Sequence, residues 1–151
     1  MAEQLLPPYS KFIVAAGTVV AATSNSAVIT LPLADSYAFV LSVTAAAGTT
    51  ETLDAAIQIT PDGGTTWFDW FRFAQVTTSA VTRRLVVQPL QGRGEAGTET
   101  AITAAGTGAL NANAPFPGSN MQIRFAYTIS GTAPSYTLGI AMVAQTRATA
   151  V

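Results

Sequence analysis

The stretch Thr60-Pro-Asp-Gly-Gly-Thr-Thr-Trp67 separates two segments that have the alternating pattern of β-strands. Before it, apolar residues alternate with polar or small ones from Leu53 onward, and after it comes the aromatic-rich run Trp67-Phe-Asp-Trp-Phe-Arg-Phe73. Pro61 presets φ for a turn, Asp62 can accept hydrogen bonds from the amides ahead of it, and the two glycines supply positive φ. The stretch therefore predicts an antiparallel β-hairpin.

Five residues of this octet fall on the positions of the Asp-box, Ser/Thr-x-Asp-x-Gly-x-Thr-Trp. They are Thr60, Asp62, Gly64, Thr66 and Trp67. The octet thus resembles a motif of sialidases and other β proteins, where it stabilises a hairpin away from the catalytic centre. The resemblance implies a structural turn and no chemistry. A β-propeller would need several copies at a regular period, and this sequence contains one.

The aromatic run after the turn carries large apolar side chains on both faces of its strand. Strict alternation groups Trp67, Asp69, Phe71 and Phe73 on one face and Phe68, Trp70 and Arg72 on the other. One face must belong to the core. Phe68 and Trp70 are then either covered by the chain's own loops or exposed as a contact patch. Such a patch would suit a protein partner, or a sugar stacked on Trp70.

The rest of the chain reads as further strands and turns. Strands are expected at 12–23, 27–33, 37–44 and 80–90, with Gly17 as a bend or bulge and 45–50 as a small-residue loop. The best-patterned hairpin is the last one, with strands at 121–130 and 136–143 around the turn Gly131-Thr-Ala-Pro134. Residues 91–119, rich in Gly, Ala and Thr, predict a long loop that holds one short strand at 98–105.

Seven to nine strands and no convincing helix predict an all-β fold, an antiparallel β-sandwich of the jelly-roll type. A chain of 151 residues is the size of one domain. We expect that domain at 12–144. It lies between an extended N-terminal arm at 1–11, which contains Pro7-Pro8, and a C-terminal tail at 145–151. The order of the strands is left open.

Charge is sparse, because charged residues make up 10 % of the chain against roughly 25 % in an ordinary soluble domain. A surface of this kind is poorly protected against association, so we expect much of it to be covered by copies of the chain or by a larger assembly. The net charge is −1 and the only adjacent basic pair is Arg83-Arg84. We therefore expect no nucleic-acid partner. The chain also lacks an apolar run of the ~20 residues that cross a membrane, and a signal-peptide pattern at its N-terminus.

The chain contains neither histidine nor cysteine. Their absence excludes Ser-His-Asp and Cys-His catalysis and nearly all zinc sites, and no loop has the spacing of calcium ligands. A carboxylate pair of the glycosidase type remains open, with Asp54 and Asp69 facing each other across the first hairpin. The simpler interpretation is that these are solvent-facing charges, with Asp69 paired to Arg72 or Arg124. We expect no catalytic residue, no metal and no cofactor.

Two segments carry a resemblance to a known family. They are Leu53-Asp-Ala-Ala-Ile-Gln-Ile-Thr-Pro-Asp-Gly-Gly-Thr-Thr-Trp67 and Met121-Gln-Ile-Arg-Phe-Ala-Tyr-Thr-Ile-Ser-Gly131. With the strand and short tail that follow the second segment, they resemble small all-β virion proteins of tailed bacteriophages, namely the head decoration or cement proteins with a jelly-roll fold. The likeness is one of general texture over about half of the chain.

This resemblance implies a non-enzymatic virion protein on the outer capsid surface, made in the host cytoplasm, that bridges capsomers and stabilises the head. Its partners would be the major capsid protein and copies of itself. We expect contacts from the 91–119 loop, from the arm residues Leu5, Leu6, Pro7, Pro8 and Tyr9, and from Phe68 and Trp70. The alternatives are a carbohydrate-binding or tail-fibre module that uses Trp70, and another tail or head–tail component.

Overall fold

The computed structural model describes residues 4–5, 8–34, 36–77, 80–87, 109–110 and 121–148. Within these ranges every regular element is a β-strand, so the expected all-β class is confirmed. The predicted strand at 98–105 lies outside the described residues, as does the predicted loop at 91–119 apart from residues 109–110.

The described strands are β1 (Gln4–Leu5), β2 (Tyr9–Val20), β3 (Ser24–Asn25), β4 (Ile29–Thr30), β5 (Ser36–Thr60), β6 (Phe68–Arg72), β7 (Val81–Val87), β8 (Ala109–Leu110), β9 (Gln122–Gln145) and β10 (Arg147–Ala148). All of their pairings are antiparallel. The long strands β5 and β9 lie side by side and organise an eight-stranded sheet. β2, β3 and β4 pair with β9, β6 and β7 pair with β5, and β8 pairs with β6.

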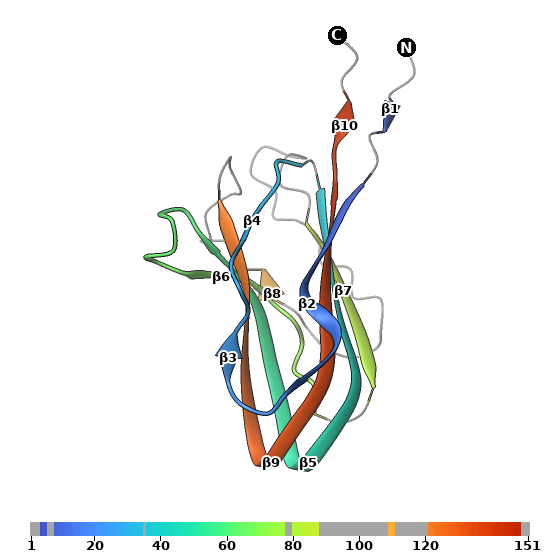
Figure 1. The fold of residues 1–151 in the computed structure, drawn as a ribbon, viewed down its shortest axis with the longest axis vertical. Helices are drawn as coiled ribbons and strands as arrows, with labels where there is room; N and C mark the ends of the chain where they lie inside the picture. The colour runs from blue at the N-terminus through green and yellow to red at the C-terminus, as the bar shows by residue number, and fades with distance from the viewer. Residues whose placement is uncertain are drawn as a thin grey trace.

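β5 and β9 bend back together at one place, so that a single sheet forms two facing layers (Figure 1). The bend lies near residues 47–52 of β5 and 130–135 of β9, where the register between the two strands shifts. The first layer contains β2, β7, the first half of β5 and the second half of β9. The second layer contains β3, β4, β6, β8 and the other halves of the two long strands.

The shared bend shows that the predicted last hairpin is wrong. Residues 121–130 and 136–143 do not pair with each other but are successive parts of β9, and each part pairs with β5. Thus Ile123 pairs with Ile59, while Ile140 pairs with Leu41. The reason is that β5 bends at the matching position, so the ladder between the two strands continues around the corner. For the same reason residues 45–50, predicted as a loop, belong to β5.

The core lies between the two layers. Its fully buried side chains alternate along the long strands, as the period-2 pattern predicts, and include Tyr37, Phe39, Leu41, Leu53, Ile57, Ile59, Ile123, Phe125, Leu138 and Ile140. Aromatic contacts join the layers, because the Trp70 ring of β6 lies 5.9 Å from the ring centroids of both Tyr37 and Phe39. The buried Tyr136 hydroxyl of β9 donates to the Val76 carbonyl oxygen at 3.3 Å.

The two ends of the chain leave the body at the same end of the molecule (Figure 1). β1 pairs there with β10, through Gln4 with Ala148 and Leu5 with Arg147. β2 begins at Tyr9, so residues 9–11 of the expected arm are part of the sheet. Gly17 has a φ of 80° and lies where the register of β2 shifts, which confirms the predicted bulge.

Candidate functional site

The turn that follows β5 is held by two side chains, Thr60 and Asp62. The buried Thr60 hydroxyl donates to Asp62 Oδ1 at 2.6 Å and accepts the Gly64 amide at 3.0 Å. Asp62 Oδ1 also accepts the amides of Thr65 at 3.1 Å and Thr66 at 2.9 Å. These hydrogen bonds satisfy the backbone donors of a turn that has no ladder partner.

The donors around Asp62 also set its ionisation. The Thr60 hydroxyl is the largest cause, followed by the Thr66 amide, and together they hold the pKa of the Asp62 carboxyl well below its usual value. Hydrogen bonds to the charged form of a carboxyl favour that form. The turn therefore depends on an ionised Asp62.

Acid should weaken this turn in a way that depends on Asp62. Because the folded pKa is lowered, the stabilisation is present above the unfolded pKa of about 3.9 and is lost as the pH falls through the folded value. The free energy of unfolding should fall between about pH 4 and pH 2 more steeply for the native chain than for Asp62→Asn. Urea denaturation followed by tryptophan fluorescence measures both slopes. Thr60→Ser, which retains the donating hydroxyl, should keep the native slope, and equal slopes for native and Asp62→Asn would contradict the role of the carboxylate.

The Trp67 side chain connects the turn to the neighbouring strand β9. Its indole Nε1–H donates to the Gly64 carbonyl oxygen at 3.0 Å. The Arg124 guanidinium lies over the indole, with Cζ 4.2 Å from the ring centroid, within the range of a cation–π interaction. All five Asp-box positions thus take part in the turn, and the last of them also fixes an arginine on the outer face of the second layer.

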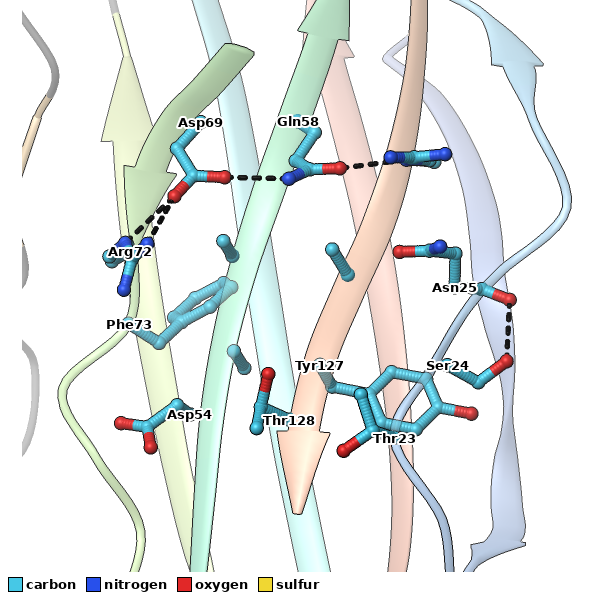
Figure 2. Close-up of a pocket in the computed structure, with 14 residues that line it drawn as sticks. Thr23, Ser24, Asn25, Asp54, Gln58, Asp69, Arg72, Phe73, Tyr127 and Thr128 are labelled. Carbon is cyan, nitrogen blue, oxygen red and sulfur yellow. Dashed lines mark hydrogen bonds and ion pairs between the residues drawn. The ribbon is translucent and has the colours of Figure 1, made fainter. Parts of the chain in front are cut away.

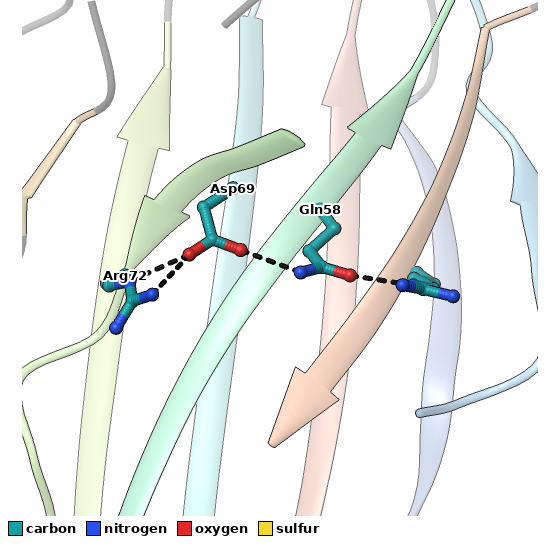
Figure 3. A network of polar contacts seen from close by, with 4 residues as sticks. Gln58, Asp69 and Arg72 are labelled. Atoms are coloured by element: carbon teal, nitrogen blue, oxygen red, sulfur yellow. Dashed lines mark hydrogen bonds and ion pairs between the residues drawn. The ribbon is translucent and has the colours of Figure 1, made fainter. Parts of the chain in front are cut away.

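A chain of polar contacts crosses this outer face from β9 to β6 (Figure 3). Arg124 Nε donates to Gln58 Oε1 at 2.7 Å, and Gln58 Nε2 donates to Asp69 Oδ1 at 2.7 Å. Asp69 Oδ2 then accepts Arg72 Nε at 2.8 Å and forms an ion pair with Arg72 Nη2 at 2.6 Å. Of the two arginines considered for Asp69, Arg72 pairs with it directly, whereas Arg124 is connected to it through Gln58.

A β-bulge in β6 decides where Trp70 lies. Ile57 pairs with Phe71 but Gln58 pairs with Asp69, so Trp70 is the extra residue on its strand. Strict alternation fails there, and both Trp70, which is 4 % exposed, and Phe71 face the core. The predicted outer patch of Phe68 and Trp70 is therefore wrong for Trp70, which is covered by Tyr37 and Phe39, while Phe68 remains 37 % exposed. No glycine in the run 67–73 signals the bulge.

Next to the polar chain, the outer face of the second layer is hollowed into a cavity of about 340 Å³, here called the polar trough (Figure 2). Its floor is formed by Ala56 and Ala126, which pair directly across β5 and β9. The other residues that line it are Thr23, Ser24, Asn25, Asp54, Ala55, Gln58, Asp69, Arg72, Phe73, Arg124, Tyr127 and Thr128. The trough exists because alanine occupies the centre of a face whose neighbouring positions carry larger side chains.

The two carboxylates of the trough do not form the pair that the sequence left open. Gln58, and not Asp54, stands opposite Asp69 in the register of the hairpin. Asp54 lies at the other side of the floor, paired with Thr128, and both of its oxygens accept Gln75 Nε2 at 3.0 Å. Figure 2 shows Asp54 and Thr128 on one side of the trough and the chain through Gln58 on the other.

The other predicted contact residues lie at or near the chain terminus. Pro8 and Tyr9 are exposed, Leu5 is described as part of β1, and Leu6 and Pro7 lie outside the described residues. Four other exposed apolar residues, Phe12, Val19, Val28 and Leu33, were not predicted, because alternation assigns a side chain to a face of the strand and does not show what covers that face.

Comparison with protein-family models, with curated proteins and with solved structures finds no match to this chain. In the ranges that the structure describes, no three His, Cys, Asp or Glu side chains gather as a set of metal ligands. Nor does this part of the chain contain a helix with the length and apolarity needed to cross a membrane.

Proposed function

We propose that this chain is a non-enzymatic structural protein of a virion, a decoration or cement protein that binds the outer capsid surface and bridges capsomers. Its partners are the major capsid protein and copies of itself. The sparse charge of the chain supports a protein that works inside a large assembly. The carbohydrate-binding alternative based on Trp70 loses its support, because that ring is buried in the core.

The observation that carries the proposal is a set of exposed apolar side chains, here called the terminal patch, at the end where β1 and β10 lie. It consists of Tyr9, Phe12 and Leu33, which are 45 %, 59 % and 65 % exposed. Tyr9 and Phe12 pair with Ala144 and Ala141 of β9, so they extend from opposite faces of the sheet at this end. The Leu33 carbonyl oxygen accepts the Thr146 hydroxyl at 3.3 Å, so all three residues lie near the end of β9.

This arrangement suits attachment to a shell. Large apolar side chains that are exposed at one end of a body are available to a protein partner. The paired strands β1 and β10 leave the body at the same end. In the described chain each of them has one partner strand, so each keeps an edge to which a strand of another protein can be added. Weak attachment of this kind gains strength when many copies bind one lattice.

The proposal is tested by the copy number of the chain in particles. Large particles are sedimented from a lysate of the source, and the chain is quantified against the most abundant shell protein. We expect the ratio of this chain to the most abundant shell protein to be near one, or a simple fraction such as one half or one third. A far lower ratio would assign the chain to a tail or vertex, and absence from the particles would refute a virion role.

Phe12→Ser should weaken binding to shells that lack the chain. If Phe12 is a hot spot of the contact, its loss costs about 2 kcal/mol, which corresponds to roughly 30-fold in affinity. Co-sedimentation of purified chain with such shells measures the change. The matched control is Val19→Ser, because Val19 is also on β2 and is 64 % exposed but pairs with Thr137, towards the bend. Equal weakening by both substitutions would contradict a role for the terminal patch.

A further inference from the structure

We propose that the polar trough on the outer face of the second layer is a binding site for a saccharide. The trough is formed by β3, β5, β6 and β9 and is separate from the terminal patch that carries the proposed function. The two proposals therefore stand or fall independently.

The shape of the trough follows from the register of its strands. Ala56 and Ala126 form a low floor, and the residues two positions away along the same strands, Asp54, Gln58, Arg124 and Thr128, form the two sides. At about 3.4 Å per residue, the four steps from Asp54 to Gln58 span roughly 13 Å. The volume of about 340 Å³ lies at the lower end of the ~300–1,000 Å³ typical of small-molecule pockets. The span separates the two sides of the trough, which leaves room for a sugar ring between them.

The lining of the trough offers donors and acceptors in balance. Arg72 and Arg124 donate, Asp54 and Asp69 accept, and the hydroxyl of Thr128 can do both. Two positive and two negative groups leave no net charge, so neither an anion nor a cation is favoured as a ligand. A hydroxyl group both donates and accepts, and hydrogen bonds to charged side chains are stronger than neutral ones. A neutral ligand with several hydroxyls matches this lining.

The polar side chains are held in place without a ligand. Arg72 is fixed by Asp69, Arg124 by Gln58 and the Trp67 ring, and Asp54 by Gln75. A site whose side chains are already ordered loses less conformational entropy on binding. Arg124 uses Nε for Gln58, and no described residue is bonded to its terminal nitrogens, which are left for a ligand.

The floor supplies the apolar part of the site. Ala56 and Ala126 lie between the two polar sides, and the C–H groups of a sugar ring can pack on their methyl groups. Tyr127 also borders the trough, but its ring is held against the buried Phe125, with the ring centroids 5.4 Å apart, and packs on the core.

Amide chemical shifts of the ¹⁵N-labelled full chain, titrated with glucose, galactose, N-acetylglucosamine, maltose and lactose, test the proposal. We expect at least one of these sugars to give saturable shifts concentrated at residues 54–58 and 124–128, with a dissociation constant in the millimolar range. The floor variant Ala126→Val fills the trough without removing a polar group, and a β-branched residue suits a strand. It should weaken binding by at least about tenfold.

The matched control is Ala38→Val, the same change at a half-buried position on the outer face of β5 in the first layer. It should bind the sugar as the native chain does. Two results would overturn the proposal. One is native affinity in Ala126→Val, and the other is no saturable shift with any of the five sugars, whether or not sodium phosphate shifts the trough residues.

Discussion

Replacing Trp70 by alanine should lower the free energy of unfolding by about 3–5 kcal/mol, the usual cost of deleting a large buried aromatic ring. The ring is 4 % exposed, joins the two layers through contacts with Tyr37 and Phe39, and also packs on Phe71 of its own strand. Its loss leaves a cavity that rigid neighbouring strands can close only in part. Equilibrium denaturation with urea, followed by far-UV circular dichroism, measures the change.

Phe68→Ala is the matched control, because Phe68 belongs to the same strand but is 37 % exposed. It should cost about 1–2 kcal/mol, since less of its ring leaves water on folding. Trp70→Phe, which keeps a ring at the site, should fall between the two and provides a folded variant if the alanine variant is too unstable. A loss below about 1 kcal/mol for Trp70→Ala would contradict the core position of this residue.

Gly131→Ala should destabilise the fold by about 2–6 kcal/mol, as the sum of backbone strain of ~1–3 kcal/mol and overpacking of ~1–3 kcal/mol. Gly131 has a φ of 120° at the bend of β9, a conformation that residues with a side chain rarely adopt. An added Cβ would lie 2.8 Å from the Glu51 Cα and 3.0 Å from the Thr49 and Thr50 carbonyl oxygens. These are backbone atoms of β5. The clash can therefore be relieved only if the backbones of β5 and β9 move apart at the bend.

Gly63→Ala separates the steric clash from the effect of losing a glycine with positive φ. Gly63 has a φ of 71°, and an added Cβ would meet no atom within 4 Å. Its substitution should cost only the left-handed strain of about 1–2 kcal/mol. Thermal and urea denaturation of both variants provide the comparison. Equal losses at the two positions would show that the close approach of β5 and β9 at the bend contributes nothing.

The two proposed surfaces differ in how they are built. The terminal patch consists of isolated apolar side chains beside the paired chain ends, which suits a large protein partner that covers them. The polar trough consists of interlinked polar side chains on the outer face of the second layer, which suits a small ligand. Substitutions at Phe12 and at Ala126 therefore test the two proposed activities separately in one protein.

Local features of the chain could be predicted from the sequence because they depend on neighbouring residues. The hairpin of β5 and β6, the turn at Asp62, the bulge at Gly17 and the strand β7 agree with the sequence patterns. In each case turn chemistry or period-2 alternation acts within a few residues.

The candidate site could be predicted only in part. Asp69 and Arg72 are three residues apart, and their pairing was considered from the sequence. The contribution of Gln58 and the alanine floor depends on the register between β5 and β9, which joins residues more than sixty positions apart. The burial of Trp70 depends on a one-residue bulge that no glycine marks, and one such shift turns a side chain to the opposite face.

The sequence by itself determined that this chain is all-β, where most of its strands run, and how its central turn is held, because alternation and turn residues act locally. Only the tertiary structure decided that residues 121–143 form one bent strand instead of a hairpin. The alternation in this segment is compatible with either arrangement. The bent strand forms because β5 bends at the matching point and pairs with both halves of β9.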